Sequence, residues 1–312
     1  MLFMKQVSFL VSISMALLCC LSCGGSGDPD TPVTPTPTPD KPTAKLPISI
    51  STNVTRATET AFENGDKIGL FVVNHNADGS AATLKLTGNH VDNMKYTYNG
   101  SWTPATQTYW KDNTTHADFY LYYPYNASLG SVDAMTWTVS ADQSTEASYK
   151  AADLMVGKTS DVAPQEAAVK IDARHMMSQM VINLVAGNGF TEASLSAAKI
   201  GVTINRLKNN GSVSLATATV TAKGDDTDIT PLKGEGNSYK ALIVPQAVGE
   251  GNLITVNVDG KNFNLTKDSK LTALAAGKTY RFTVTLSKTS NGVNVNIIKW
   301  EDDGVDYGGT AE

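Results

Sequence analysis

The chain has 312 residues, of which 41% are hydrophobic and 18% are charged, so it belongs with globular proteins rather than disordered ones. Its formal net charge of −5 and the lack of a basic run argue against binding to nucleic acid. All three cysteines (Cys19, Cys20 and Cys23) lie near the N-terminus, which excludes disulfides and cysteine-ligated zinc from the rest of the chain.

Residues 1–22 resemble the signal peptide of a bacterial lipoprotein. Lys5 precedes an apolar stretch, residues 7–21, that is short for a membrane span and suits a signal-peptide core. The stretch ends in "CLSCGG", which is similar to a lipobox, where signal peptidase II cuts before a cysteine that receives acyl chains. We therefore expect export and lipidation of Cys23. An ordinary secretory signal that is cut nearby is the alternative.

Residues 23–45 predict a linker between the lipid anchor and the folded part. The stretch "TPVTPTPTPDKPT" alternates threonine with proline, which favours an extended polyproline II conformation. At roughly 3 Å per residue, such a tether spans about 60–70 Å. We expect it to hold the folded part away from a membrane surface, and a proline-rich peptide ligand for another protein is the alternative.

From Leu46 onward, short strand-like runs alternate with turn signals. In residues 46–167 these runs are "LPISISTNV", "DKIGLFVV", "MKYTYNGSW", "ADFYLYYPY" and "AMTWTVS", and they are followed by the less regular stretch "YKAADLMVGKTSDVAPQEA". For the aromatic run 119–125, core packing is a better explanation than a platform for sugars. The first of these runs places Leu46, Ile48 and Ile50 at alternate positions, as expected for one buried face of a strand.

Residues 168–312 continue the same pattern. Two strand-like runs share "AAVKIDARHMMSQMVINLVAG", and "TEASLSAAK" predicts a short helical turn. The pair Asp259-Gly260 predicts a two-residue hairpin, because type I′ turns need positive φ at both positions. The run "YRFTVTL" alternates apolar and polar residues. The chain therefore predicts an all-β fold of two tandem antiparallel β-sandwiches, residues 46–167 and 168–312, with few short helices.

Motifs for catalysis or metal binding are lacking. No HExxH, GxSxG, P-loop or GxGxxG pattern occurs, and the four histidines are scattered. The stretch "NHNADGS" imitates the first half of a calcium loop, but Lys85 stands at the twelfth position, where a glutamate belongs. We therefore expect no metal, no cofactor and no enzymatic activity. An exported hydrolase is the weakest alternative, because no pair of carboxylates stands in a recognisable setting.

Seven stretches follow one another behind the lipobox: "TRATETAFENGDKIGLFV", "DFYLYYPY", "ADLMVGK", "VKIDARHMMSQMVINL", "LIVPQ", "LAAGKTYRFTVTL" and "IIKWEDDG". In this order and spacing the chain resembles the fimbrillin family, the type V pilin-like fimbrial subunits that derive from lipoproteins. The resemblance covers nearly the whole mature chain. It implies two transthyretin-like sandwiches, a surface-exposed location at the outer membrane or in a fimbrium, and other fimbrial subunits as partners.

The resemblance also implies processing. In shaft subunits of this family a trypsin-like protease cuts after an arginine behind the first strand, and a strand from a neighbouring subunit fills the vacated groove. In this chain the matching cut follows Arg56. The displaced strand then carries Leu46, Ile48, Ile50 and Val54, whose burial at 1.5–3 kcal/mol each contributes roughly 6–12 kcal/mol. Alternatively, Arg56 is a solvated charge beside a strand that stays in place.

The C-terminal stretch "GVNVNIIKWEDDGVDYGG" is the expected donor strand, in which Val293, Val295 and Ile297 alternate. The tail after Trp300 is short and acidic, which leaves a tip or anchor role open beside a shaft role. A receptor on a host or bacterial surface is an expected partner. The alternative function is a non-polymerising surface lipoprotein that binds a glycan or a host protein.

Overall fold

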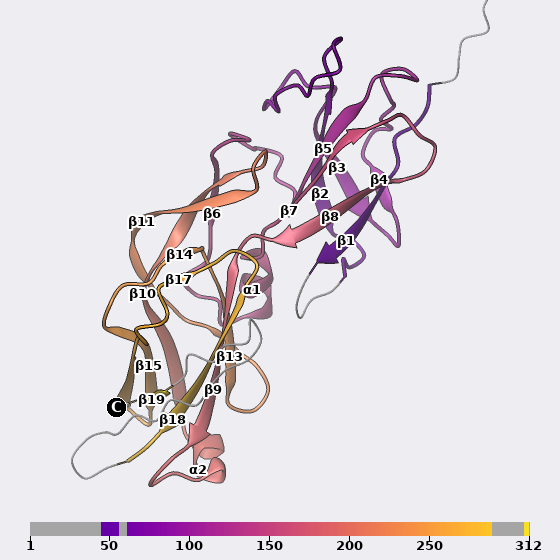
Figure 1. Cartoon of the computed structure of the whole chain (residues 1–312). Coiled ribbons are helices and arrows are strands. Elements are labelled where there is room, and N and C mark those ends of the chain that lie inside the picture. The colour runs from indigo at the N-terminus through magenta and orange to yellow at the C-terminus, as the bar shows by residue number, and fades with distance from the viewer. Residues whose placement is uncertain (1–44, 56–60, 289–308, 312) are drawn as a thin grey trace, which may run out of the picture. The chain divides into compact units, whose positions relative to one another are not determined.

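The computed structural model describes residues 45–55, 61–288 and 309–311. They form strands β1 to β19 and two short helices, and residues 44–312 belong to one compact unit (Figure 1). The predicted all-β class is confirmed. Most strand pairs are antiparallel as predicted, but the pairs β1–β8, β9–β18 and β18–β19 are parallel.

A seven-stranded sheet contains most of the first half of the chain, in the order β1-β8-β7-β5-β2-β3-β4. Its strands are β1 (Ile50–Thr55), β2 (Lys67–Asn74), β3 (Val91–Tyr98), β4 (Trp102–Pro104), β5 (Ala117–Tyr123), β7 (Met155–Val162) and β8 (Val169–His175). Strand β8 follows the expected domain boundary at residues 167/168, yet it pairs with β1 and β7.

Strands β2 and β5 are buried along nearly their whole length and are mostly apolar, because both faces of the sheet are covered. Ile68, Leu70 and Val72 enter one buried cluster, whereas Phe71 and Val73 enter another. The aromatic run in β5 divides in the same way between the two clusters. These side chains therefore build the core, as expected from their place on a strand.

The second half of the chain, together with β6 from the first half, forms two five-stranded sheets and one two-stranded sheet. The first has the order β11-β10-β15-β16, with β6 also paired to β10, and consists of β6 (Met135–Thr138), β10 (Ile200–Ser214), β11 (Thr219–Ile229), β15 (Asn252–Val258) and β16 (Lys261–Thr266). The second has the order β12-β13-β9-β18-β19 and consists of β9 (Ser178–Ala186), β12 (Leu232–Lys233), β13 (Ser238–Ile243), β18 (Thr279–Leu286) and β19 (Gly309–Ala311). Strands β14 (Gln246–Ala247) and β17 (Ala273–Leu274) form the small sheet.

Two local predictions for this half are confirmed. Asp259 and Gly260 have φ values of 50° and 87° and connect β15 to β16 in a two-residue hairpin. Strand β18 alternates strictly, and the four residues that it buries are Tyr280, Phe282, Val284 and Leu286.

Helices α1 (Glu146–Ala151) and α2 (Glu192–Ala197) are both six residues long. Each begins with a capping box, formed by Thr145 with Ser148 and by Thr191 with Ser194. Helix α2 confirms the predicted helical turn, whereas α1 lies in the stretch that the sequence left irregular. Neither helix has the length and apolar character needed to cross a membrane, within the part of the chain that is described.

Candidate functional site

The segment that precedes Arg56 enters the fold before β1 begins. The Ile48 N–H donates to the Thr108 carbonyl, and the Trp110 N–H donates to the Leu46 carbonyl, both at 2.9 Å. Between them, Pro47 and Tyr109 form an antiparallel bridge. Residues 46–48 are thus held by the main chain of residues 108–110.

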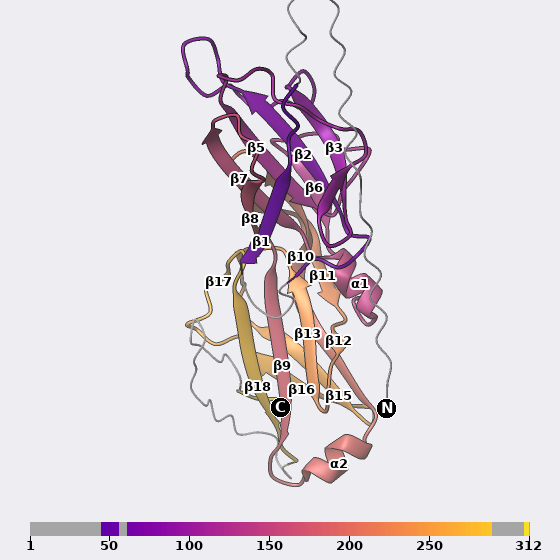
Figure 2. The same ribbon diagram turned by 90° about the vertical axis from the view of Figure 1, so that its right-hand side faces the viewer.

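The backbone of the segment then changes partner and pairs with β8. Strand β1 runs parallel to β8, from Ile50 opposite Val169 to Thr55 opposite Arg174, and the Val169 N–H donates to the Ser49 carbonyl at 2.9 Å. Strand β1 is the end strand of the seven-stranded order, beside β8, and Figure 2 shows it in front of the other strands of this part. Its backbone therefore has one strand as a neighbour among the described residues.

The side chains of the segment lie deep even though the strand is at an edge. Ile48 is 1% exposed and Ile50 is 6% exposed, and Leu46 is partly buried against the same cluster. Ser49 and Ser51, on the other face, are exposed. The alternation predicted for this strand is therefore present, with its apolar residues in the core.

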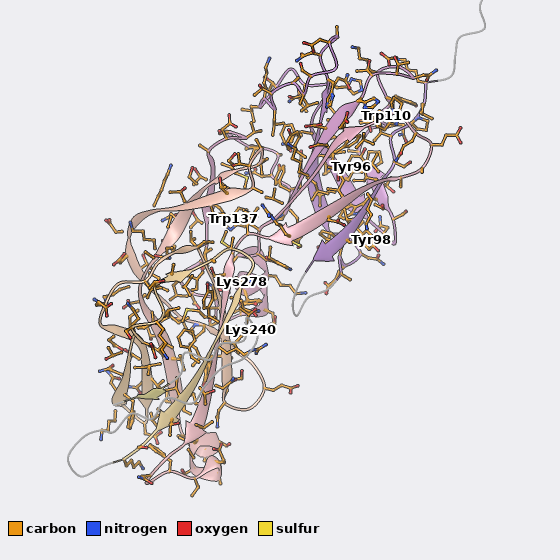
Figure 3. All side chains as sticks on the ribbon, in the orientation of Figure 1. Tyr96, Tyr98, Trp110, Trp137, Lys240 and Lys278 are labelled. Carbon is orange, nitrogen blue, oxygen red and sulfur yellow. The ribbon has the colours of Figure 1, made fainter. Side chains whose placement is uncertain are left out.

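An aromatic wall lines the place where this strand lies. The ring of Phe62 meets that of Trp102 edge-on at 4.9 Å, and the ring of Trp110 meets that of Phe119 edge-on at 5.4 Å. Tyr96 and Trp110 stand among the strands of this part in Figure 3. Since all of these rings belong to the same cluster as Ile48 and Ile50, loss of the segment would open a large apolar surface.

Several predicted site residues lie outside the described residues. These are the lipidation residue Cys23, the processing residue Arg56 and the donor-strand residues Val293, Val295 and Ile297. Val54 is described through its backbone, which pairs with Ala173. For the C-terminal tail, β19 pairs in parallel with β18, from Gly309 opposite Val284 to Ala311 opposite Leu286.

A buried ionic cluster lies just past Asn74, where β2 ends, and is not apparent from the sequence. His75 is 7% exposed at its side chain, and its Nε2 lies 2.9 Å from Oδ1 of Asp118, which is 3% exposed. The other ring nitrogen lies 3.1 Å from the Gly79 carbonyl oxygen. Because both neighbours accept hydrogen bonds, this geometry suits the doubly protonated imidazolium. The two partners are 43 residues apart, so no local pattern signals them.

The electrostatics of this cluster follow from its contacts. The hydrogen bond with Asp118 raises the pKa of His75, and this effect exceeds the opposing effect of burial. Burial by itself raises the pKa of Asp118, but the bonds from His75 and the Asp161 N–H lower it overall. Within residues 45–55, 61–288 and 309–311, no three His, Cys, Asp or Glu side chains form a metal-binding group.

These features define a class of protein: an all-β chain that carries its N-terminal strand at a sheet edge, in contact with the core. The chain belongs to the fimbrillin-like family, whose family model matches residues 55–300. The predicted resemblance is thereby confirmed.

Relatives and solved structures agree with this membership. The chain is 28% identical over 282 residues to a protein described as the fimbrium subunit Fim1C of Bacteroides uniformis, covering 86% of this chain and 88% of that protein. It is also 28% identical, over 40% of this chain and 24% of that protein, to one described as the fimbrium tip subunit Fim1C of Bacteroides ovatus. The crystal structure of a cell adhesion protein from B. uniformis superposes with a TM-score of 0.61 and 25% identity, covering 85% of this chain and 98% of that one.

Proposed function

We propose that this fimbrillin-like chain is a fimbrial subunit that is exported as an outer-membrane lipoprotein and assembles by strand exchange. Lipidation of Cys23 anchors it, and cleavage after Arg56 releases β1 from the chain that follows. Its partners are other fimbrial subunits, as the names of its relatives suggest. It acts as a structural or adhesive protein and not as an enzyme.

The observation that carries this proposal is the double role of residues 46–55. The backbone of β1 (Ile50–Thr55) lies at the edge of the sheet, where an added strand can pair, while the side chains of Ile48 and Ile50 complete the core. Strand β1 ends at Thr55, one residue before Arg56. A cut there leaves the strand held by noncovalent contacts alone, so that another strand can compete for its place.

The energies involved fit a switch of this kind. Burial of Ile48 and Ile50 contributes about 1.5–3 kcal/mol each. A typical domain is stable by about 5–15 kcal/mol, so a domain without this strand is marginal and has an open edge. A strand from a second molecule restores both the core and the backbone pairing. Head-to-tail contacts of this type do not close, and they therefore produce fibres.

The donor strand in this proposal is the C-terminal segment with Val293, Val295 and Ile297. Strand β19, which follows this segment, adds to β18 in parallel. A subunit whose C-terminal segment stays within its own fold would accept a strand without donating one, as a tip subunit does.

Limited trypsin digestion of the full chain tests the proposal. We expect a cut after Arg56, followed by ladders on a gel of samples that were not boiled. The Arg56→Gln variant should give no ladder, whereas Lys45→Gln, which removes an exposed site in front of the strand, should behave like the parent chain. A chain that is cut after Arg56 and stays a folded monomer would overturn the assembly step. That result would favour the alternative, a non-polymerising surface lipoprotein that binds a glycan or a host protein.

A further inference from the structure

A pocket of about 470 Å³ opens where β2 ends and the loop of residues 75–90 begins. Its lining includes Asn74, Asn76, Thr83, Lys85 and His90. In the sheet, Asn74 pairs with Ala117 at one end of β5, while β1 lies at the far end of the order, beside β8. The pocket is therefore separate from the β1 site.

Polar groups without partners gather around this pocket. Oδ1 of Asn74 is buried and has no hydrogen-bond partner among the described residues. Among the described residues, the Thr83 hydroxyl and the Lys85 ammonium group make no hydrogen bond or ion pair with the protein, and both side chains are exposed at the mouth of the pocket. A buried acceptor that lacks a donor costs about 1–3 kcal/mol, so a ligand that donates a hydroxyl there stabilises the site.

The charge of the pocket favours an anion. Lys85 is the one fully charged side chain among the lining residues, and it stands where a calcium loop would carry its glutamate. The nearby carboxylate of Asp92 is already engaged, because it accepts from the N–H groups of Gly88 and Asn89. A cation is therefore disfavoured, and the lysine is available for a carboxylate.

His90 adds a group whose orientation is fixed. Its Nε2 lies 2.7 Å from the Tyr109 carbonyl oxygen, which can only accept, so Nε2 donates. In the neutral ring, Nδ1 is then an acceptor for a ligand hydroxyl. The walls are also held in place: Asn89 accepts from the Lys85 N–H at 3.0 Å, and Asn76 donates from its side chain to Ser80 at 3.0 Å. Such preorganisation lowers the entropic cost of binding.

The geometry points to a binding site for a carboxylate-bearing saccharide. The lysine favours an acid group, whereas Asn74 and His90 offer acceptors for ligand hydroxyls, and a sugar acid carries both in one small molecule. The volume lies within the range of ordinary ligand pockets. This inference goes beyond the proposed assembly and does not depend on cleavage or strand exchange.

Calorimetry tests the inference by measuring how tightly D-glucuronate and D-glucose bind to the full chain in detergent. The two sugars differ by the carboxylate, so we expect glucuronate to bind about ten- to a hundredfold more tightly. Lys85→Gln should abolish that difference, and Lys233→Gln, at an exposed lysine outside the pocket, should preserve it. Thr83→Val should weaken both sugars.

Three results would overturn the inference. One is the absence of saturable glucuronate binding, and another is binding that Lys85→Gln leaves unchanged. The third is equal binding of inorganic phosphate or acetate, which would reveal a simple anion site without selectivity for the sugar. Because none of these readouts involves polymers, failure here is distinguishable from failure of the assembly proposal.

Discussion

The indole Nε1 of Trp102 donates a hydrogen bond of 2.9 Å to the hydroxyl of Thr52. Trp102 lies in β4 and Thr52 lies in β1, which are the two end strands of the seven-stranded order. A side-chain bond therefore links the two end strands, although their backbones do not pair. Side chains of both strands, among them Ile50 and Trp102, enter the same buried cluster, so an edge strand can carry buried side chains.

Thr52→Val tests this hydrogen bond with little change of shape. Because Trp102 is 8% exposed, its N–H then lacks an acceptor, and we expect the free energy of unfolding to fall by about 1–2 kcal/mol. Urea denaturation measures this change. Ser51→Ala, at the exposed neighbouring position, should stay within about 0.5 kcal/mol of the parent. An equal stability of Thr52→Val and the parent would show that the bond between Trp102 and Thr52 does not stabilise the fold.

Ile48→Ala and Ile50→Ala test the contribution of β1 to the core. Each leaves a cavity beside the aromatic wall, so we expect each to lower the free energy of unfolding by about 2–5 kcal/mol. Ser49→Ala, on the exposed face between them, is the matched control. Both variants should also be cut faster after Arg56, because a less stable strand opens more often. If truncation of either isoleucine costs no more than Ser49→Ala, the segment is not part of the core.

The His75 pair predicts a dependence of stability on pH. Because the folded-state pKa of His75 is raised, its contribution is complete below the unfolded value of about 6.5 and declines as pH rises through the folded value. Asp118 acts in the opposite sense, since its pKa is lowered and its contribution is lost as pH falls through that value. The pair thus contributes most to the free energy of unfolding at a pH between the pKa of Asp118 and the pKa of His75.

Unfolding in urea from pH 5 to pH 9 measures this effect against His75→Gln. The titratable groups that face His75 and Asp118 include Asp161 at 3.6 Å from the ring, Lys158 at 3.7 Å from the carboxylate, and the Tyr120 hydroxyl, which donates to that carboxylate at 3.3 Å. We expect the advantage of the parent over the variant to be largest near pH 6 and to shrink toward pH 9. Asp118→Asn should remove that trend. An advantage that is constant over the whole range would show that His75 stays in one protonation state.

Replacement of one buried polar residue, Gln143, should lower the free energy of unfolding strongly. Its side chain is fully buried, and it accepts from the Leu242 N–H at 2.9 Å and donates to the Leu242 carbonyl at 2.8 Å. The Gln143 side chain thus satisfies the main chain of β13 as a neighbouring strand would. Gln143→Leu leaves both main-chain groups unpaired, and we expect a loss of about 2–4 kcal/mol in urea denaturation. Gln165→Leu, whose amide donates within its own loop, should change stability by less than about 0.5 kcal/mol.

Local signals in the sequence predict much of this fold. The Asp259-Gly260 turn and the alternation in β18 depend on residues within one hairpin or strand, so their structure follows from nearby residues. The alternation of Ile48 and Ile50 likewise predicts which face of β1 is buried.

Features that depend on distant residues could not be predicted in this way. Strand β6 precedes the expected boundary at 167/168 but pairs with β10, whose partner residues lie about seventy positions further along the chain. Helix α1 begins with Thr145 and Ser148, a capping box without the usual glutamate or glutamine, which makes its start hard to see. The His75–Asp118 pair and the Trp102–Thr52 bond join separate strands, so they arise only after the sheet has formed.

The central claim is that residues 45–55 fill a slot that a strand from another molecule can refill. The most direct measurement is the uptake of a labelled peptide of residues 45–55 by the full chain after a cut behind Arg56, in mild urea. We expect one peptide to bind per chain, and we expect no binding of a peptide that carries Ile48→Asp and Ile50→Asp. Loss of the native segment with no uptake of the labelled peptide, at an unchanged melting temperature, would contradict the claim.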